Sequence, residues 1–457
     1  MMAAFPQFIT PRKGGLELMA IVTPNTGTQS GTQATASSPG QSYGAPLATV
    51  TTLFFMWGFL TCLNDILVPH LKPIFDLNYT KVMLIQFAFF GAYFLFSIPS
   101  AKIIDWIGYQ RSMVAGLLIM GLGAFLFVPA ASVPSYPLFL GALIVLAAGI
   151  TCLQVAANPY VTVLGKPETA SSRLNLTQAF NSLGTFLAPF FGGLFILTAA
   201  RNIDEVRALA PDALQAYRLH EAATVKLPYV GLGIALVLLA IAIGSFKLPK
   251  IPHAQHQIGE KVNDSIWKHP NLIFGAIGIF VYVGAEVSIG SFLVNYFSQP
   301  EIGGLTEKVA ASFVAFYWGG AMVGRFIGSA LLQKVKTGGL LGICAVCAAG
   351  LVAVSMLTTG HLAMYSIILV GFFNSIMFPS IFTLGVAELG PLTGDGSGIM
   401  IMAIVGGAII PVAQGWIADH IGIHHAFFLP VICYVYILYF ALSGSRPNSE
   451  RYASASS

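Results

Sequence analysis

Long apolar runs separated by short polar segments fill most of this chain. A helix needs about 20 apolar residues to cross a bilayer. By this measure the pattern predicts twelve membrane-spanning helices, six on each side of one longer polar segment. The predicted spans are Thr51–Ile74, Val82–Ile104, Met113–Val133, Leu138–Leu164, Leu174–Ala200, Leu227–Phe246, Leu272–Phe297, Val309–Leu332, Leu340–Thr359, Leu362–Leu384, Gly398–Ile417 and Ala426–Leu442.

The polar segments divide the chain into five parts. Residues 1–45 are rich in Ser, Thr, Gly, Pro and Gln, which predicts a disordered cytoplasmic tail. A first six-helix bundle covers 46–246, a cytoplasmic linker covers 247–270, and a second bundle covers 271–443. Residues 444–457 form a second cytoplasmic tail. The predicted fold class is therefore an all-α membrane protein made of two six-helix bundles.

Composition supports lipid as the solvent. Of 457 residues, 56% are hydrophobic and only 9% are charged, and mean hydropathy is +0.78. Soluble domains carry about 25% charged residues. These values exclude a soluble enzyme, a disulfide scaffold and a disordered chain. The net charge of +4 is too small for a nucleic-acid binder, and the five cysteines lie in apolar runs without the further ligands that a metal site needs.

Basic residues predict the orientation in the membrane. With the N-terminus inside, 14 Lys and Arg residues fall in cytoplasmic segments, 7 fall in outer segments, and Arg325 lies within a helix. Cytoplasmic loops carry an excess of Lys and Arg. Both termini are therefore predicted to be cytoplasmic, and the expected location is a bacterial inner membrane.

The two bundles repeat each other at a nearly constant shift. Gly184, Pro189 and Gly193 match Gly406, Pro411 and Gly415 at an offset of 222, and Pro159 and Gly165 match Pro379 and Gly385 at 220. Asp65 falls on Glu286 at 221, and Gln154 falls on Asn374 at 220. Parallel repeats of this kind are typical of transporters whose substrate binds near the midplane between the halves. Chance matches in a Gly-rich chain are the alternative.

Two carboxylates lie inside apolar spans, Asp65 in the first and Glu286 in the seventh. An ionisable group at membrane depth costs at least about 2.5 kcal/mol and normally faces a cavity or a partner. A carboxylate there either takes up a proton or binds a cation, so both are candidates for ion coupling, with Asn64 beside Asp65. A structural hydrogen bond to a neighbouring helix is the alternative for each.

Uncharged polar residues form stripes on two helices. Thr151, Gln154 and Asn158 share one face of the fourth span, and Gln178, Asn181 and Thr185 share one face of the fifth. Amides that both donate and accept suit a ligand covered with hydroxyl groups, and aromatic rings can stack on a sugar. Interhelical hydrogen bonding is the alternative. The predicted sugar-binding set is Gln154, Asn158, Gln178, Asn181, Glu286, Asn374, Tyr282 and Trp318.

Other charged residues lie near the predicted cytoplasmic ends of the helices. They are Asp105, Arg111, Arg325 and Glu388. We interpret these as latch residues that hold one conformation, with Glu388 or Asp395 as the partner of Arg325; a purely structural role is the alternative. No Walker, GxSxG or HExxH motif occurs, so neither an enzyme nor a cofactor is predicted.

Four motifs carry a resemblance to a known family. Asn64-Asp-Ile-Leu-Val-Pro69, Ala156-Ala-Asn-Pro159, Arg173–Ser182 and Tyr282-Val-Gly-Ala-Glu286 resemble the fucose–proton symporter family of the major facilitator superfamily. The likeness runs from about Thr51 to Leu442. Within that family the sequence is most similar to bacterial glucose/galactose transporters.

The resemblance implies roles for some of these residues. In the L-fucose permease the first-helix aspartate, here Asp65, is implicated in proton coupling, and the fifth-helix glutamine, here Gln178, contributes to sugar binding. The permease has glutamate where this chain has Gln154 and glutamine where it has Glu286. One carboxylate is thus missing and another lies across the cavity, which leaves the sugar and the proton route open.

The predicted function is import of a hexose of the glucose/galactose type, coupled to a proton or sodium and working by alternating access. The partners are the sugar and the lipid bilayer, with no nucleic acid, and the protein is expected to be a monomer. The alternatives are an uncoupled facilitator, a drug or metabolite exporter of the same superfamily, and a sugar sensor. An exporter would favour a broad apolar pocket, and a sensor would need a large effector domain.

Overall fold

The computed structural model describes residues 43–75, 79–133, 135–195, 209–224, 226–249 and 264–447. Side chains are described within these ranges except at positions 63–75, 79–83, 189–195, 218, 221–225 and 307. The described helices belong to one compact unit, Ser42–Ser457, and no strand occurs in these ranges. Most of the two predicted tails, and positions 250–263 of the predicted linker, lie outside the described residues.

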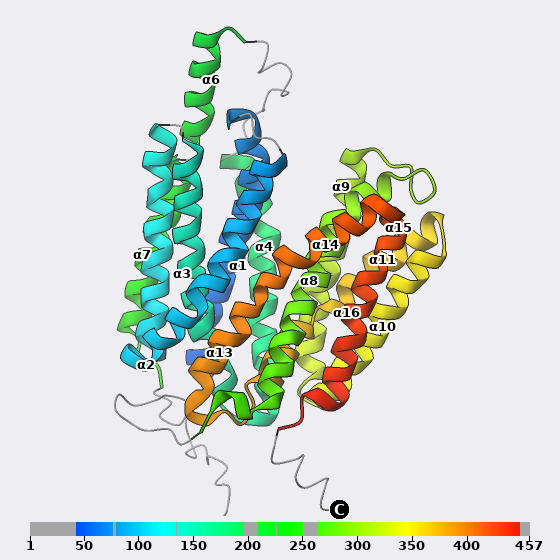
Figure 1. Cartoon of the computed structure of the whole chain (residues 1–457). Coiled ribbons are helices and arrows are strands. Elements are labelled where there is room, and N and C mark those ends of the chain that lie inside the picture. Colours follow the sequence, from blue (N-terminus) through cyan, green and yellow to red (C-terminus); the bar gives the residue numbers. More distant parts are fainter. Residues whose placement is uncertain are drawn as a thin grey trace, which may run out of the picture. The chain divides into compact units, whose positions relative to one another are not determined.

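The helices before the linker are called the N-terminal group here (Figure 1). They are α1 (Gly44–Phe75), α2 (Tyr79–Ser132), α3 (Tyr136–Val163), η1 (Pro167–Thr169), α4 (Ala170–Phe195), α6 (Pro211–Thr224) and α7 (Lys226–Ser245). Within this group α2 packs on α3 and α7, and α1 packs on α4. The predicted second and third spans are joined in α2, which turns at Gly108, where φ is 81°, a conformation that glycine adopts without steric cost.

The helices after the linker form the C-terminal group. They are η3 (Ile266–Lys268), α8 (Pro270–Ser298), α9 (Glu307–Leu331), α10 (Thr337–Leu357), α11 (Gly360–Asn374), α12 (Met377–Gly385), η4 (Gly390–Leu392), α13 (Thr393–Met402), η5 (Ala403–Val405), α14 (Gly406–Ile421), α15 (Ile423–Ala426), α16 (Phe428–Tyr439) and the π-helical turn η6 (Phe440–Gly444). The predicted tenth span is thus divided between α11 and α12, and the eleventh between α13, η5 and α14.

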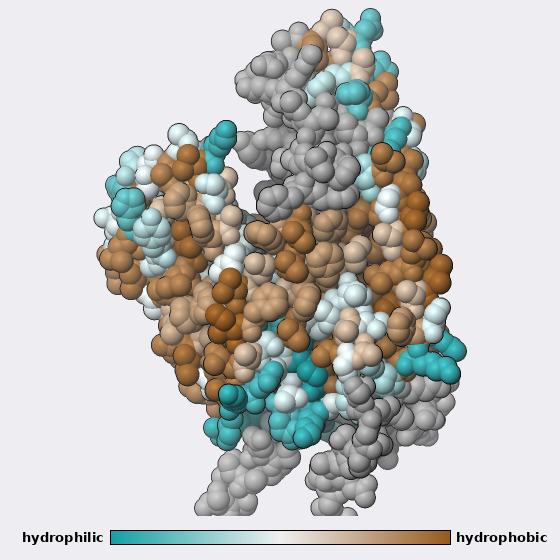
Figure 2. All heavy atoms as spheres, turned by 180° about the vertical axis from the view of Figure 1, so that it is seen from behind, coloured by the Kyte–Doolittle hydropathy of each residue, from teal (hydrophilic) through white to brown (hydrophobic). Residues whose placement is uncertain are grey.

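The surface of these helices is suited to lipid. Ten helical segments in the described ranges are long and apolar enough to cross a membrane. One of them, Leu84–Ser132, contains two predicted spans, and α4, which carries the polar stripe of the fifth span, is outside this set. Figure 2 shows hydrophobic side chains in a broad band with hydrophilic ones gathered below it. The all-α membrane fold is confirmed, and a helix lies at each of the twelve predicted spans.

The two groups meet mainly through α2 against α13 and α4 against α9. In the first contact Gly398 is so close to α2 that a side chain there would collide with Ala101. In the second, the rings of Phe180 and Phe326 pack edge to face with centroids 6.0 Å apart. The polar residues of both groups lie beside these contacts.

Candidate functional site

Glu286 lies at the centre of a hydrogen-bonded cluster in the C-terminal group. Tyr282, one helical turn earlier on α8, donates its hydroxyl to Glu286 Oε1 at 2.8 Å. Tyr317, on α9, donates to the main-chain carbonyl of Glu286 at 3.4 Å. The Glu286 side chain is 13% exposed, whereas Tyr282 and Tyr317 are buried. One phenol therefore holds the Glu286 carboxylate, and a second holds the backbone of the same residue.

Asn374, the last residue of α11, connects the tyrosines. Its Nδ2 donates to the Tyr317 hydroxyl at 2.9 Å, its Oδ1 accepts from Tyr434 of α16 at 2.8 Å, and its carbonyl lies 3.1 Å from the Tyr282 hydroxyl. Asn374 is fully buried. The predicted sugar-binding amide of the tenth span thus lies behind Glu286 and contacts three tyrosines.

Arg325 is the cationic partner of Glu286. Its Nη2 lies 4.0 Å from Glu286 Oε1, its Nη1 donates to Ser182 Oγ on α4, and its Nε donates to the carbonyl of Ser375 at 3.4 Å. The predicted partners of Arg325 were Glu388 and Asp395, and this pairing is wrong. Asp395 instead pairs with Lys102. Arg325 instead lies between the Glu286 carboxylate and Ser182 of α4, in the N-terminal group.

A proline explains why the Ser375 carbonyl is available. Pro379 has no N–H, so it cannot make the usual helical bond to the carbonyl four residues earlier, and its ring disfavours a continuous helix there. The helix accordingly breaks between α11 and α12. The repeat-related Pro159 frees the carbonyl of Val155 in the same way, and that oxygen accepts from Ser397 of α13 at 2.8 Å. Each proline thus supplies an acceptor for a side chain from another helix.

Gln154 occupies the corresponding place in the N-terminal group. Its Nε2 donates to the Tyr93 hydroxyl of α2 at 2.7 Å. Gln154 Oε1 is buried without a partner among the described residues. Each group thus has an amide on its fourth span that bonds to a buried phenol, which agrees with the repeat offset of 220 between Gln154 and Asn374.

Two further stripe residues, Asn158 on α3 and Gln178 on α4, have amide atoms that are unpaired within the described ranges. Asn158 is fully buried, and both atoms of its amide lack a hydrogen-bond partner within the described part of the chain, as does Gln178 Nε2. A buried amide group left unpaired costs about 1–3 kcal/mol. These atoms are therefore the ones that water or a polar ligand would satisfy.

Asn181 and Thr185 join α4 to α1. Asn181 Nδ2 donates to the carbonyl of Phe54 at 2.9 Å, and Thr185 Oγ1 donates to that of Gly58 at 3.3 Å. A side chain at Gly184 would collide with the α1 backbone at Phe55. Close packing against α4 therefore fixes the course of α1 up to the segment that carries Asn64 and Asp65. Both of these predicted coupling residues lie within α1, but their side chains are outside the described residues.

Trp318, on α9, packs beside Gly290, which lies one turn along α8 from Glu286. A side chain at Gly290 would collide with its indole ring, and Gly290 shares a helix face with Glu286 and Tyr282. The ring packs edge to face on Tyr317 with centroids 5.1 Å apart and is 41% exposed. This predicted sugar-binding residue therefore has an accessible aromatic surface next to the α8 face that carries Glu286.

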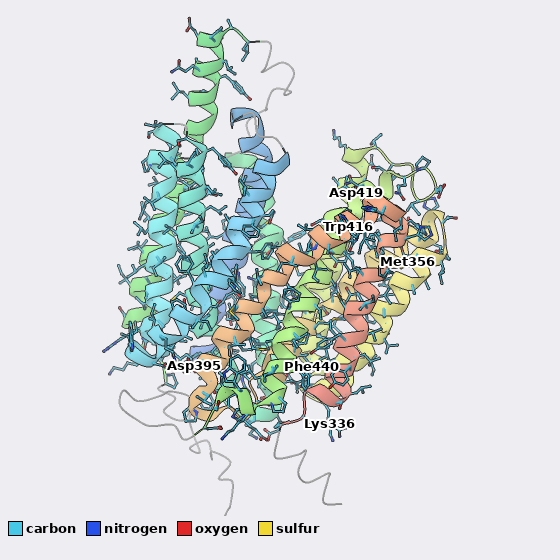
Figure 3. The ribbon with its side chains drawn as sticks, viewed as in Figure 1. Lys336, Met356, Asp395, Trp416, Asp419 and Phe440 are labelled. Carbon is cyan, nitrogen blue, oxygen red and sulfur yellow. The ribbon has the colours of Figure 1, made fainter. Side chains whose placement is uncertain are left out.

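The two groups are joined by polar contacts at the end predicted to be cytoplasmic. Lys102 Nζ lies 2.7 Å from Asp395 and 3.4 Å from Asp105. Ser172 Oγ donates to the carbonyl of Ser329 at 2.7 Å, and Ser329 Oγ donates back to the carbonyl of Ser172 at 3.1 Å. Figure 3 shows Asp395 at this lower end and Trp416 and Asp419 at the opposite end. We call these contacts the lower seam.

Sequence reasoning found Asp105 among the residues of this seam but missed several others. Those missed are Lys102, Ser171, Ser172, Ser329, Thr383 and Ser397. The predicted latch residue Arg111 is exposed, and Glu388 adopts a left-handed backbone with φ of 59°. A serine in a helix gives no signal of its partner, so only the fold reveals the paired serines.

A groove of about 900 Å³ between α1, α4 and α7 is a less suitable place for a polar ligand. Its lining is almost entirely apolar, with Thr51 and Thr52 as the hydroxyl-bearing residues, and sugar hydroxyls buried there would lose hydrogen bonds to water. Within the described residues no three His, Cys, Asp or Glu side chains gather in a way that would hold a metal ion.

Comparison with known proteins places this chain in a family. Residues 48–404 match the model of the Major Facilitator Superfamily. A glucose/galactose transporter of Brucella abortus is 54% identical over 412 residues, which are 90% of this chain and 97% of that protein. The L-fucose–proton symporter of Escherichia coli is 35% identical over 409 residues, covering 88% and 93% of the two chains.

A solved structure gives the same result. The crystal structure of an L-fucose–proton symporter in the outward conformation has 33% sequence identity and a TM-score of 0.81, and the match covers 89% of this chain and 100% of that chain. These relatives are transporters rather than enzymes. The family predicted from the four sequence motifs is confirmed: the chain belongs to the Major Facilitator Superfamily.

Proposed function

We propose that this protein is a secondary transporter that imports a hexose, of the glucose or galactose type, by alternating access coupled to a cation. The observation that carries the proposal is the placement of Glu286, Arg325 and Trp318 together at membrane depth, partly exposed. A carboxylate and a guanidinium can bond to several sugar hydroxyls, and an indole can stack on the apolar face of the ring. The names of the curated relatives, a glucose/galactose transporter and an L-fucose–proton symporter, support a sugar as substrate.

The lower seam supports the outward-open state for this structure. If Lys and Arg are concentrated on the cytoplasmic side, the contacts of Lys102 with Asp395 and of Ser172 with Ser329 close the cytoplasmic end. The relative whose structure was solved in the outward conformation matches 89% of this chain over its own full length. We place both termini in the cytoplasm of a bacterial cell, in its inner membrane, and propose that the monomer is the transporting unit.

A proton is the coupling ion that we propose, with Asp65 as its carrier. The relatives that are named as symporters are named as proton symporters. Glu286 already has a cation at 4.0 Å and a phenol donor at 2.8 Å, so its charge is balanced within the protein. We therefore propose that Glu286 chiefly binds the sugar. Asp65, with Asn64 beside it, is then the residue that gains and loses the proton.

An Asp65→Asn variant tests the coupling. The amide keeps the shape and a hydrogen-bonding group but removes the charge that changes state. Counterflow exchange of labelled glucose or galactose in proteoliposomes, which needs no net ion movement, should persist at a reduced rate. Accumulation driven by an imposed proton gradient should be lost.

Glu286→Gln is the matched control, because it removes a carboxylate from the repeat-related position. It should weaken sugar binding and retain dependence on the gradient. If Asp65→Asn still concentrates sugar, Asp65 is not the carrier. If a sodium gradient alone drives accumulation of sugar, the coupling ion is sodium and not a proton. If the parent protein only equilibrates sugar across the membrane and never accumulates it, the protein is an uncoupled facilitator.

A further inference from the structure

We propose that Tyr434, which does not reach the site, is a positioning residue whose hydroxyl fixes the hydrogen bonds behind Glu286 and so determines which hexose the site prefers. This inference rests on the proposed function. Tyr434 lies on α16 and is fully buried. Its hydroxyl donates to Asn374 Oδ1 at 2.8 Å, so its influence on a sugar must pass through Asn374.

The hydrogen bonds from Tyr434 to Glu286 run in one direction. With Oδ1 of Asn374 occupied by Tyr434, Nδ2 donates to the Tyr317 hydroxyl at 2.9 Å. A phenol has one proton, and that of Tyr317 is then left for the main-chain carbonyl of Glu286, 3.4 Å away. Tyr282 shares its proton between Glu286 Oε1 at 2.8 Å and the Asn374 carbonyl at 3.1 Å.

The opposite direction leaves a buried proton unpaired. If the Asn374 amide were turned over, Tyr317 would donate to Oδ1 and Nδ2 would donate to Tyr434. The Tyr434 proton would then have no acceptor within the described part of the chain, and the Glu286 carbonyl would lose its donor. An unsatisfied buried donor costs about 1–3 kcal/mol, enough to select the observed direction by at least fivefold.

Removal of the Tyr434 hydroxyl leaves a buried acceptor unpaired. In Tyr434→Phe no donor remains for Asn374 Oδ1, which costs about 1–3 kcal/mol and favours a displacement of Asn374. Because Tyr317 and Tyr282 both bond to Asn374, that displacement loosens their bonds to Glu286 and the turn of α8 that carries it. Glucose and galactose differ only in the direction of one ring hydroxyl, so a small displacement of an acceptor should change their relative affinity.

The experiment measures the equilibrium binding of glucose and of galactose to the purified full-length protein. For Tyr434→Phe we expect the affinity for at least one sugar to fall about fivefold and the ratio of the two affinities to change by about threefold, in line with the loss of one buried hydrogen bond. The matched control is Tyr160→Phe. Tyr160 is also a buried tyrosine and donates to the carbonyl of Pro249 at 3.2 Å in the N-terminal group, and its loss should leave both affinities within twofold of the parent.

A double-mutant cycle separates positioning from a general structural effect. In a Glu286→Ala background, Tyr434→Phe should change neither affinity by more than twofold, since the side chain that it positions is absent. Tyr317→Phe interrupts the same path at a second point and carries the test if Tyr434→Phe does not fold. Losses that add in the double variant, or a Tyr434→Phe protein with parental affinities and ratio, would overturn the inference. A parent protein that binds neither sugar would overturn the proposed function, and this inference with it.

Discussion

Polar side chains at membrane depth have few available partners, and this decides how each of them is used. Glu286 is held by Tyr282 and Arg325, and Gln154 by Tyr93. Sequence reasoning identified most of these residues because an ionisable or amide group in an apolar run is costly and therefore rarely accidental. It did not identify Tyr434, because a tyrosine is common in apolar helices and its hydroxyl partner lies 60 positions away in the chain.

The sequence also could not separate residues that reach the site from those behind it. Asn374 and Glu286 are both polar residues in apolar helices, yet Asn374 is fully buried and the Glu286 side chain is 13% exposed. The difference depends on how α8, α11 and α16 pack. Periodicity along one helix indicates which residues share a face but not which neighbouring helix covers that face.

At the residue scale, we expect the amides of the N-terminal group to contribute directly to sugar affinity. Gln178 Nε2 and Gln154 Oε1 are buried without partners among the described residues. Their truncation in Gln178→Ala and Gln154→Ala should each weaken binding of the transported hexose by roughly tenfold, as expected for one or two hydrogen bonds. Gln154→Ala should also lower the melting temperature, because it removes the bond to Tyr93. Equilibrium binding with purified protein provides the measurement.

Gln110→Ala is the control for those two variants. Gln110 is an amide of the same kind, and its Nε2 donates to the carbonyls of Ile243 and Phe246 between α2 and α7. Its loss should reduce stability without a specific effect on affinity. Parental affinity in both test variants would show that the sugar does not contact these amides.

At the element scale, breaks in helices create acceptors that regular helices lack. Pro159 and Pro379 occur at the same place in the two repeats, and the carbonyls that they free accept from Ser397 and Arg325. The twelve helices were predictable because hydropathy is a local property. The separation of the second and third spans was also predicted. That it takes the form of a turn at Gly108 within one helix, α2, was not, nor was the break at η5, because both depend on the helices against which these segments pack.

Two kinds of contact between α13 and the N-terminal group are expected to differ in strength. The side chains of Lys102 and Asp395 are 50% and 27% exposed, and exposed ion pairs contribute about 0–1 kcal/mol. Ser397 is fully buried, and its loss would leave the Val155 carbonyl without a partner at a cost of about 1–3 kcal/mol. Ser397→Ala should therefore loosen the lower seam more than Asp395→Asn does.

The alkylation rate of a reporter cysteine measures this loosening. In a cysteine-free background, Ser329→Cys places the reporter on α9 at a position that is 5% exposed and faces α4. Its rate should rise by at least about fivefold with Ser397→Ala and by no more than about fivefold with Asp395→Asn, as the two energies imply. The reverse order would show that the ion pair, and not the proline-freed carbonyl, holds the seam.

At the scale of the whole molecule, the contacts between the two groups gather at one end. Ser171 bonds to Thr383 at 2.6 Å and Ser172 to Ser329, so α4 is fastened to both α12 and α9. Short hydroxyl bonds are a reasonable choice for a seam that must open, because each is worth only about 0.5–1.5 kcal/mol and water can replace it. Charged pairs buried at the same place would be slower to separate.

The last prediction follows from this seam. The Oγ atoms of Ser172 and Ser329 are 3.4 Å apart, so cysteines at these positions are within reach of a disulfide after small side-chain adjustments. All five native cysteines are free and would first be replaced. The pair Ser172→Cys and Ser329→Cys should then crosslink in the absence of sugar and block net transport, because α4 and α9 can no longer separate.

Reduction should restore transport in the same sample, and neither single cysteine should be inhibited by oxidation, which excludes general damage. Addition of the transported sugar under a proton gradient should slow crosslinking, because a larger fraction of molecules then has the seam open. A second cysteine pair, made by Ser171→Cys on α4 and Thr383→Cys on α12, should respond to sugar and to reduction in the same way as the first pair. A crosslink that forms at the same rate in every condition and leaves transport intact would mean that these helices stay together throughout the cycle, and that the two groups of helices do not alternate about this end.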